Sequence, residues 1–327
     1  MKPQLPPRLR AGDQLRVIAP SQSMERFGSD QPALAARRLE KEYGLTVTYG
    51  DHVWKDGPLG AASVDDRVAD MHAAFTDPDV AGILAVTGGF NSNQLLPYLD
   101  YDLIAAHPKV FCGYSDITAL NHALLARANL VTYSGPHFST FAMRDHLEGT
   151  IDAFHRCLFT SEPVRWAPSP YFTDDDWYEA QDDRRQEHTD GWWVLQPGTA
   201  SGQIVGANLC TLNLLQGTPY QPPLTGAVLF VEDDYETDAK TFDRDLTSLL
   251  QAAGTIRGLV VGRFQQASDV GRELLTHIVS TKRELTGLPV LANVDFGHTN
   301  PLYTFPIGGE CWIAADPGAV EIVLTRH

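Results

Sequence analysis

Cysteine is scarce in this chain of 327 residues, which contains four. The four stand far apart, and none pairs with a second Cys or a His at the spacing of zinc ligands. They are Cys112, Cys157, Cys210 and Cys311. An HExxH motif is also lacking. We therefore expect neither a metal ion nor another cofactor, and thiols scattered in this way fit a reducing compartment.

Long hydrophobic runs and positive charge are lacking as well. No stretch approaches the roughly 18 apolar residues that cross a membrane, and residues 1–8 lack the apolar core of a signal peptide. Lys and Arg number 25 against 41 Asp and Glu, which gives a formal net charge of −16. That charge repels polyanions. No basic patch in the sequence offsets it, because Arg37-Arg38 and Arg184-Arg185 are isolated pairs. The sequence thus predicts a cytoplasmic protein without a nucleic-acid or membrane partner.

Strand and helix patterns alternate through the first half of the chain, whose composition (43% hydrophobic, 20% charged) is that of a globular protein. Apolar runs typical of buried strands, and segments with helical spacing of apolar residues, follow one another. The predicted strands are 15–19, 45–49, 82–86 and 110–112, and the predicted helices are 32–43, 65–75, 93–99 and 117–128. This alternation predicts an α/β fold with a mostly parallel sheet covered by helices on both faces.

The pattern changes after about residue 160. Residues 161–200 hold four prolines, the acidic run Asp174-Asp175-Asp176 and four tryptophans, with no persistent apolar period. We interpret them as a connector with a substrate-covering loop. The predicted strands beyond them are 202–206, 226–231, 258–262 and 319–324, with helices at 238–253 and 269–285. The expected units are therefore a domain at 1–165, a linker and loop at 166–200, and a strand-rich domain at 201–327.

Ser115 lies where a predicted strand turns into a predicted helix, in Gly113-Tyr114-Ser115-Asp116-Ile117. Open α/β sheets place their sites at such carboxyl ends of strands. The turn is similar to a nucleophile elbow, although Ile117 stands where an elbow has its second glycine. A second interpretation is that Ser115 or Asp116 caps the helix, since both residue types accept bonds from free N–H groups. The segment alone leaves both open.

Three further segments offer groups that a serine nucleophile needs. The pair Gly88-Gly89 follows a strand and can turn backbone N–H groups toward an oxyanion, or form an ordinary turn. Glu232 ends a strand, where it can orient a histidine or simply be solvated. His298 stands in a loop, as a base or as one surface histidine among 11. Together Ser115, Glu232 and His298 supply nucleophile, orienting acid and base, and the site would then lie between the two domains.

With these motifs the sequence resembles the LD-carboxypeptidase family of serine peptidases (family S66), which includes muramoyltetrapeptide carboxypeptidases and microcin C immunity peptidases. The resemblance covers nearly the whole chain and is carried by residues 12–21, 88–100, 113–118, 231–233 and 297–298. It implies a Rossmann-like N-terminal domain, a strand-rich, β-barrel-like C-terminal domain, and a homodimer.

The resemblance also implies roles for single residues. Ser115 would attack the carbonyl, His298 would act as general base and then acid, and Glu232 would orient His298. The backbone N–H groups of Gly89 and Asp116 would form the oxyanion hole. No metal takes part in such a mechanism.

The branch of the family decides the expected substrate. Asn91-Ser92-Asn93 looks more like the microcin-immunity branch, and Thr87 stands where murein enzymes are expected to have an arginine. Gly88 and Asn91 are further candidate substrate contacts. Trp192 and Trp193 could stack on an adenine-like ring, or they could pin the loop to the core. We therefore expect hydrolysis of an amide in an aminoacyl-nucleotide or acyl-sulfamoyl adenylate through an acyl-enzyme.

Three alternatives remain from the sequence. The first is a murein tetrapeptide LD-carboxypeptidase that releases terminal D-Ala from a small peptide. The second belongs to another class, a non-catalytic two-domain binding protein. The third is a different α/β hydrolase such as an esterase, against which the missing glycine after Ser115 and the strand-rich second half count.

Overall fold

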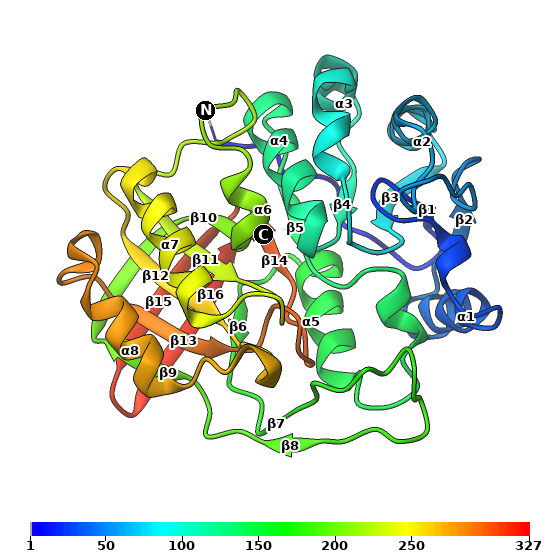
Figure 1. Cartoon of the computed structure of the whole chain (residues 1–327). Helices are drawn as coiled ribbons and strands as arrows, with labels where there is room; N and C mark the ends of the chain where they lie inside the picture. The colour runs from blue at the N-terminus through cyan, green and yellow to red at the C-terminus, as the bar shows by residue number, and fades with distance from the viewer. Residues whose placement is uncertain (1) are drawn as a thin grey trace.

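A computed structural model describes residues 2–327, and its N-terminal part is built on a six-stranded sheet (Figure 1). Neighbouring strands in this sheet are parallel, apart from β14, which is antiparallel to β5. The strands are, in spatial order, β14 (Phe305–Ile307), β5 (Thr132–Ser134), β4 (Val110–Cys112), β3 (Val80–Ala85), β1 (Gln14–Ile18) and β2 (Thr46–Tyr49). The order confirms the expected parallel, doubly wound sheet, whose ligand sites lie beyond the carboxyl ends of the strands.

Helices cover both faces of this sheet because its strands are apolar on both sides. In β3, Ile83 packs into one hydrophobic cluster with α2–α4, while Leu84 packs into the other with α1 and α5. The helices are α1 (Gln31–Tyr43), α2 (Val64–Thr76), α3 (Tyr101–Ala106), α4 (Thr118–Ala128) and α5 (Glu148–Phe159). The segment 93–99, expected as a helix, lies in 3₁₀ turns at Ser92–Tyr98 instead, with Pro97 inside them.

An eight-stranded sheet forms the second part, which confirms the strand-rich expectation. Its strands are, in spatial order, β6 (Val164–Trp166), β16 (Ala319–Arg326), β15 (Glu310–Asp316), β10 (Gly198–Asn208), β11 (Ala227–Glu232), β12 (Gly258–Gly262), β13 (Val290–Val294) and β9 (Trp193–Gln196). The central strands β10 to β13 are parallel, and the outer ones are antiparallel. The helices α6 (Leu209–Asn213), α7 (Ala239–Ala253) and α8 (Arg272–Ser280) pack on one face.

Short segments cross between the two parts. β14 comes from the C-terminal half of the chain and completes the N-terminal sheet, while β6 and β9, near the two ends of the connector, join the C-terminal sheet. Between them, β7 (Tyr171–Phe172) and β8 (Glu187–His188) form a two-stranded ribbon that runs along the lower edge of the molecule in Figure 1. Within residues 2–327, no helix combines the length and apolarity of a membrane span.

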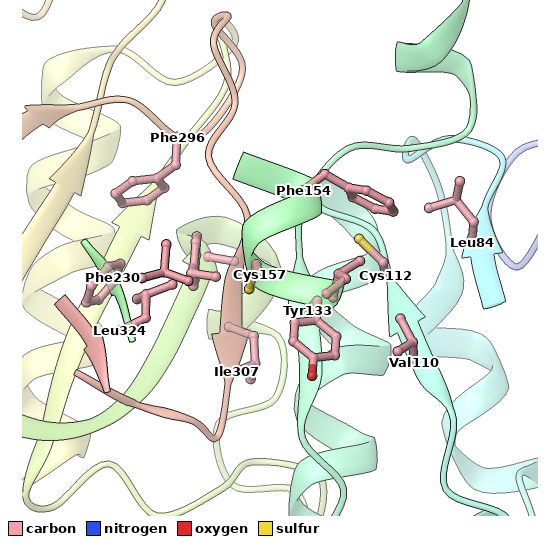
Figure 2. Packing of buried hydrophobic residues seen from close by; sticks show 14 of the residues in the cluster. Leu84, Val110, Cys112, Tyr133, Phe154, Cys157, Phe230, Phe296, Ile307 and Leu324 are labelled. Atoms are coloured by element: carbon pink, nitrogen blue, oxygen red, sulfur yellow. The ribbon is translucent and has the colours of Figure 1, made fainter. Parts of the chain in front are cut away.

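One apolar cluster joins the two parts. Figure 2 shows Phe230 and Phe296 of the C-terminal part on one side, Tyr133 of the N-terminal sheet and Phe154 of α5 on the other, and Cys157 of α5 between them. All of these side chains are almost completely buried. Because the cluster is continuous, the core holds the ends of both sheets in a fixed relation.

Candidate active site

Ser115 begins a 3₁₀ turn between β4 and α4, and its φ of 57° lies in the left-handed region. A non-glycine residue held there by its surroundings is a frequent feature of active sites and of nucleophile elbows. Gly113 is needed before it, because a Cβ at that position would lie 2.9 Å from Cγ2 of Ile117. Ile117 thus occupies the space that a second elbow glycine would leave open.

Asp116 does not cap α4, so the capping interpretation fails for this residue. Its buried carboxylate instead accepts hydrogen bonds from Ser21 Oγ and from the Ser92 backbone N–H, both at 2.7 Å. Burial raises the pKa of Asp116, and these hydrogen bonds oppose the rise. The side chain therefore ties the loops after β1 and β3 to the turn that carries Ser115.

The glycine pair packs directly against this turn. A Cβ on Gly88 would lie 2.8 Å from Ser115 Cβ and 3.0 Å from its Oγ. Gly89 has a φ of 105°, and a Cβ there would meet the Gln22 side chain at 2.4 Å. In the described chain, no hydrogen bond engages the backbone N–H of Gly89 or of Asp116. The pair is thus more than an ordinary turn, since only glycine allows so close an approach.

The buried Glu232 and the partly exposed His298 form a pair at the other side of the site. Nδ1 of His298 lies 2.7 Å from Oε2 of Glu232, whose side chain is 2% exposed at the end of β11. Burial by itself lowers the pKa of His298, but the charge and the hydrogen bond of Glu232 outweigh it, so that the pKa is raised above 6.5. Because Nδ1 faces the carboxylate, Nε2 is the nitrogen left to exchange a proton.

Packing behind the pair explains how residues 66 positions apart meet. Phe230 and Phe296, each two residues before a member of the pair, lie with ring centroids 5.7 Å apart. Gly262 ends β12, which lies between β11 and β13, and a Cβ there would stand 2.5 Å from the Phe296 carbonyl oxygen and 2.8 Å from Glu232 Cβ. A side chain at this position would therefore push the acid and the His298 loop apart.

Tyr114 connects the serine turn to the histidine. Its ring packs edge-on to His298, with centroids 5.1 Å apart, and stacks on His137 at 4.1 Å. Burial lowers the pKa of His137 to about 3, so this second histidine is neutral. Between residues 2 and 327 no hydrogen bond joins Ser115 Oγ to His298, and catalytic hydrogen bonds are often long without a ligand. His137 follows an unremarkable Gly-Pro pair, so sequence patterns gave no signal for it.

A cleft lies between the two parts of the molecule, and we call it the interdomain cleft. Its walls come from Tyr114, from residues 173–178 of the ribbon loop, from Asp234-Tyr235 and from the loop 297–300. His298 therefore faces the cleft, as expected of a site between domains. No three His, Cys, Asp or Glu side chains among the described residues are grouped so that they could hold a metal ion.

A different tryptophan from the expected ones reaches the cleft. Trp177 lines it together with Tyr178, whereas Trp192 and Trp193 do not. Trp192 is buried, and its Nε1 donates to Asp295 Oδ2 at 2.8 Å, while Trp193 Nε1 donates to Asp190 at 2.9 Å. The expected stacking role is thus not matched by the position of Trp192, and its indole holds the connector to the core. The tryptophan-rich segment does bring one ring to the cleft, but the sequence does not say which one.

Comparison with known proteins adds the family. Residues 15–135 match the model of the LD-carboxypeptidase N-terminal domain, and residues 201–313 match that of the C-terminal domain. The chain belongs to the LD-carboxypeptidase family. It is 46% identical to YocD of Bacillus subtilis (strain 168), over 98% of this chain and 99% of YocD. As a member of this family it is a serine-type carboxypeptidase.

Solved structures of MccF and of an MccF-like protein share the fold. The crystal structure of an MccF-like protein from Bacillus anthracis superposes with a TM-score of 0.97 at 44% identity, over 99% of this chain and 100% of that one. The structure of MccF in complex with glutamyl sulfamoyl guanosine gives a TM-score of 0.89 at 25% identity, over 99% of each chain. These likenesses confirm the expected two-part fold.

Proposed function

We propose that this protein hydrolyses an amide bond with Ser115, Glu232 and His298 as its catalytic triad. The observation that carries the proposal is the pair of the buried Glu232 and His298, in which His298 faces the interdomain cleft near the strained Ser115 turn. A hydroxyl is a weak nucleophile unless a base removes its proton, and the base needs a carboxylate that fixes its tautomer.

Each step of the reaction has a group to carry it. Ser115 Oγ attacks the substrate carbonyl while its proton passes to His298 Nε2, and the imidazolium is stabilised by Glu232. The backbone N–H groups of Gly89 and Asp116 bind the oxyanion of the tetrahedral intermediate. When the C–N bond breaks, His298 returns the proton to the leaving nitrogen and an acyl-enzyme remains. Water then attacks the ester in the same way, which releases the acid and restores Ser115.

Aminoacyl-nucleotides or acyl-sulfamoyl adenylates are the substrates that we propose. Trp177 and Tyr178 line the cleft and offer aromatic faces for a base. None of the residues that line it, within 2–327, is a Lys or Arg that would bind a terminal carboxylate. The MccF relative, whose structure holds glutamyl sulfamoyl guanosine, supports the same class.

The second candidate is the release of terminal D-Ala from murein tetrapeptides. The family description favours it, because both matching domain models are those of LD-carboxypeptidases. We also propose a cytoplasmic homodimer; the four cysteines are all free thiols, which suits a reducing compartment, and the dimer rests on the family resemblance.

A mass-spectrometric hydrolysis assay tests the triad and the substrate together. Wild type, Ser115→Ala and the control Ser280→Ala, an exposed serine on α8, each receive aspartyl-sulfamoyl adenosine and, separately, a murein tetrapeptide ending in D-Ala. We expect the adenosine compound to be cleaved by wild type and by the control, with at least about a thousandfold loss in Ser115→Ala.

Other outcomes separate the alternatives. Cleavage of the tetrapeptide alone would establish the murein activity and refute our choice of substrate. Full activity of a folded Ser115→Ala protein would refute the triad. Binding without turnover of either compound would favour the non-catalytic binding protein.

A further inference from the structure

We propose that Arg67 is a positioning residue that holds the two oxyanion donors at the spacing that the reaction needs. The inference deepens the proposed function and rests on it, because it concerns the backbone N–H groups of Gly89 and Asp116 that would bind the oxyanion. Arg67 lies on α2 and is only 4% exposed. An arginine is always charged, and a buried charge is costly unless it is well bonded. Its bonding partners therefore indicate its role.

The guanidinium of Arg67 donates to neutral oxygens of two loops. Nη1 donates to the carbonyl of Pro20 at 3.0 Å and to that of Asn91 at 3.3 Å, and Nη2 donates to Oε1 of Gln94 at 2.8 Å. Pro20 follows β1, whereas Asn91 and Gln94 follow β3. The planar fork of an arginine can bridge several acceptors at fixed angles, and here it joins the loop after β1 to the loop after β3.

Asp116 binds the residues that come next in the same two loops. Its carboxylate accepts from the Ser21 hydroxyl and from the Ser92 backbone N–H, both at 2.7 Å. The Ser92 hydroxyl donates in turn to the Asp116 carbonyl at 2.7 Å. In each loop the cation thus takes a carbonyl, and the anion takes a donor from the following residue. We call Arg67 and Asp116 the loop clamp, because two opposite charges hold the same loops at adjacent positions.

The two charges of the loop clamp also depend on each other. Burial lowers the pKa of Arg67, and the charge of Asp116 opposes this effect. Burial raises the pKa of Asp116, and its hydrogen bonds and the charge of Arg67 oppose the rise. Each group therefore stabilises the charged form of the other. Without the guanidinium, Asp116 would be a buried carboxylate that has lost this compensating charge, so both halves of the loop clamp should weaken.

The loop clamp holds Gly89 from two sides. Gly89 lies two residues before Asn91 in the loop after β3, so the bond from Arg67 to the Asn91 carbonyl fixes the chain just beyond it. The loop after β1 supports Gly89 through Gln22, whose Cδ would lie 2.4 Å from a Cβ on this glycine. Asp116 supplies the second N–H from its own backbone. A displacement of about 1 Å can lower a rate about a hundredfold, so the spacing of the two donors is what Arg67 would control.

The experiment compares the full chain with its Arg67→Met and Arg67→Lys variants. The substrate is aspartyl-sulfamoyl adenosine, or the murein tetrapeptide if wild type cleaves only that compound. Methionine removes the charge and the donors, whereas lysine keeps the charge but cannot bridge three acceptors in the same way. We expect kcat to fall about a hundredfold in Arg67→Met and less in Arg67→Lys, with KM within about threefold of wild type.

Two further measurements separate positioning from a general loss of structure. The Kd of the uncleaved substrate should be the same for Ser115→Ala alone and for Ser115→Ala combined with Arg67→Met, because the oxyanion forms only in the reaction. The control is Arg8→Met, since Arg8 also donates to two backbone carbonyls, those of Cys157 and the C-terminal His327. It should lower the midpoint of urea unfolding and leave kcat at the wild-type value.

The outcomes keep the two levels of the proposal distinct. If Arg67→Met retains the wild-type kcat, or if its substrate Kd rises as much as its kcat falls, the positioning role is wrong while the amidase function stands. An equal loss of kcat in Arg8→Met would also refute it, because lost stability would then explain the effect. If Arg67→Met does not fold, the same measurements on Arg67→Lys decide. If wild type cleaves neither compound, the proposed function fails, and the inference fails with it.

Discussion

The Glu232–His298 pair offers the sharpest test of the site through the variant Glu232→Gln. The wild-type carboxylate lies 2.7 Å from Nδ1 and accepts its proton, which leaves Nε2 free to act as base. A glutamine has nearly the same shape but can turn its NH₂ group toward Nδ1. That contact favours the tautomer with the proton on Nε2, and such a histidine cannot accept the proton of Ser115.

The expected loss of kcat in Glu232→Gln is the result of two contributions. A charge-assisted hydrogen bond contributes about 1.5–3 kcal/mol, which alone would lower the rate by about tenfold to a hundredfold. The wrong tautomer adds to this, and in other triads the equivalent change costs about four powers of ten, or about 5 kcal/mol of transition-state stabilisation. We therefore expect kcat to fall by about 10⁴, with a fold that still unfolds cooperatively.

The pH dependence gives a second, independent readout. His298 must be neutral to act as base, and its raised pKa puts the acid limb of kcat/KM above pH 6.5 in wild type. Burial lowers this pKa, and the charges that raise it come from Glu232 and then from Asp234 and Asp233, while His137 is neutral. Without the Glu232 charge, the effect of burial dominates and lowers the pKa of His298, so the acid limb of kcat/KM must move to lower pH.

The assay is a set of kcat/KM profiles between pH 5 and 9 for wild type, Glu232→Gln and the control Glu273→Gln, an exposed change on α8. The control should follow the wild-type profile. A folded Glu232→Gln protein that loses less than tenfold in rate, or whose acid limb stays in place, would refute the role assigned to Glu232.

Two further predictions concern packing around the site. Gly88→Ala puts a Cβ 2.8 Å from Ser115 Cβ and should displace Ser115. Because a displacement of about 1 Å at a nucleophile can lower the rate about a hundredfold, kcat should fall by at least that factor. An active Gly88→Ala enzyme would show that the Ser115 turn accommodates the extra methyl group. Trp192→Phe removes the donor to the buried Asp295 carboxylate and should lower the free energy of unfolding in urea by about 1.5–3 kcal/mol at unchanged KM. A raised KM with full stability would instead support the stacking role expected from the sequence.

Strong periodic patterns predicted most of the first sheet. The apolar runs at 15–19, 82–86 and 110–112 correspond to β1, β3 and β4, because a strand buried on both faces is apolar throughout. β14 could not be found in this way. Its three residues, Phe305–Ile307, pair with β5 about 170 positions earlier, and a local pattern carries no information about so distant a partner.

The candidate site was predictable where residue type determines chemistry. Ser115, Glu232 and His298 were each ambiguous alone and predicted a triad only together, and the acid and the histidine indeed meet. The tryptophans were not distinguishable, because any of them could cover a ligand. What separates Trp192 from Trp177 is a buried acceptor, Asp295, which lies about 100 positions further along the chain.

The geometry of the site depends on several glycines, because the lack of a side chain lets neighbouring segments approach closely. Gly88 lets the loop after β3 approach Ser115, and Gly262 leaves room between Glu232 and the backbone of Phe296. Gly297 is the third such glycine. Its φ is 110°, and a Cβ there would lie 3.0 Å from a Glu232 oxygen, so both the backbone and the packing exclude a larger residue. None of these glycines carries a reactive group, so reasoning from residue chemistry passed over Gly262, and it singled out Gly88 for its backbone N–H and not for this close approach. Substitutions there should impair catalysis with every functional group still present, since what they change is the distance between the groups.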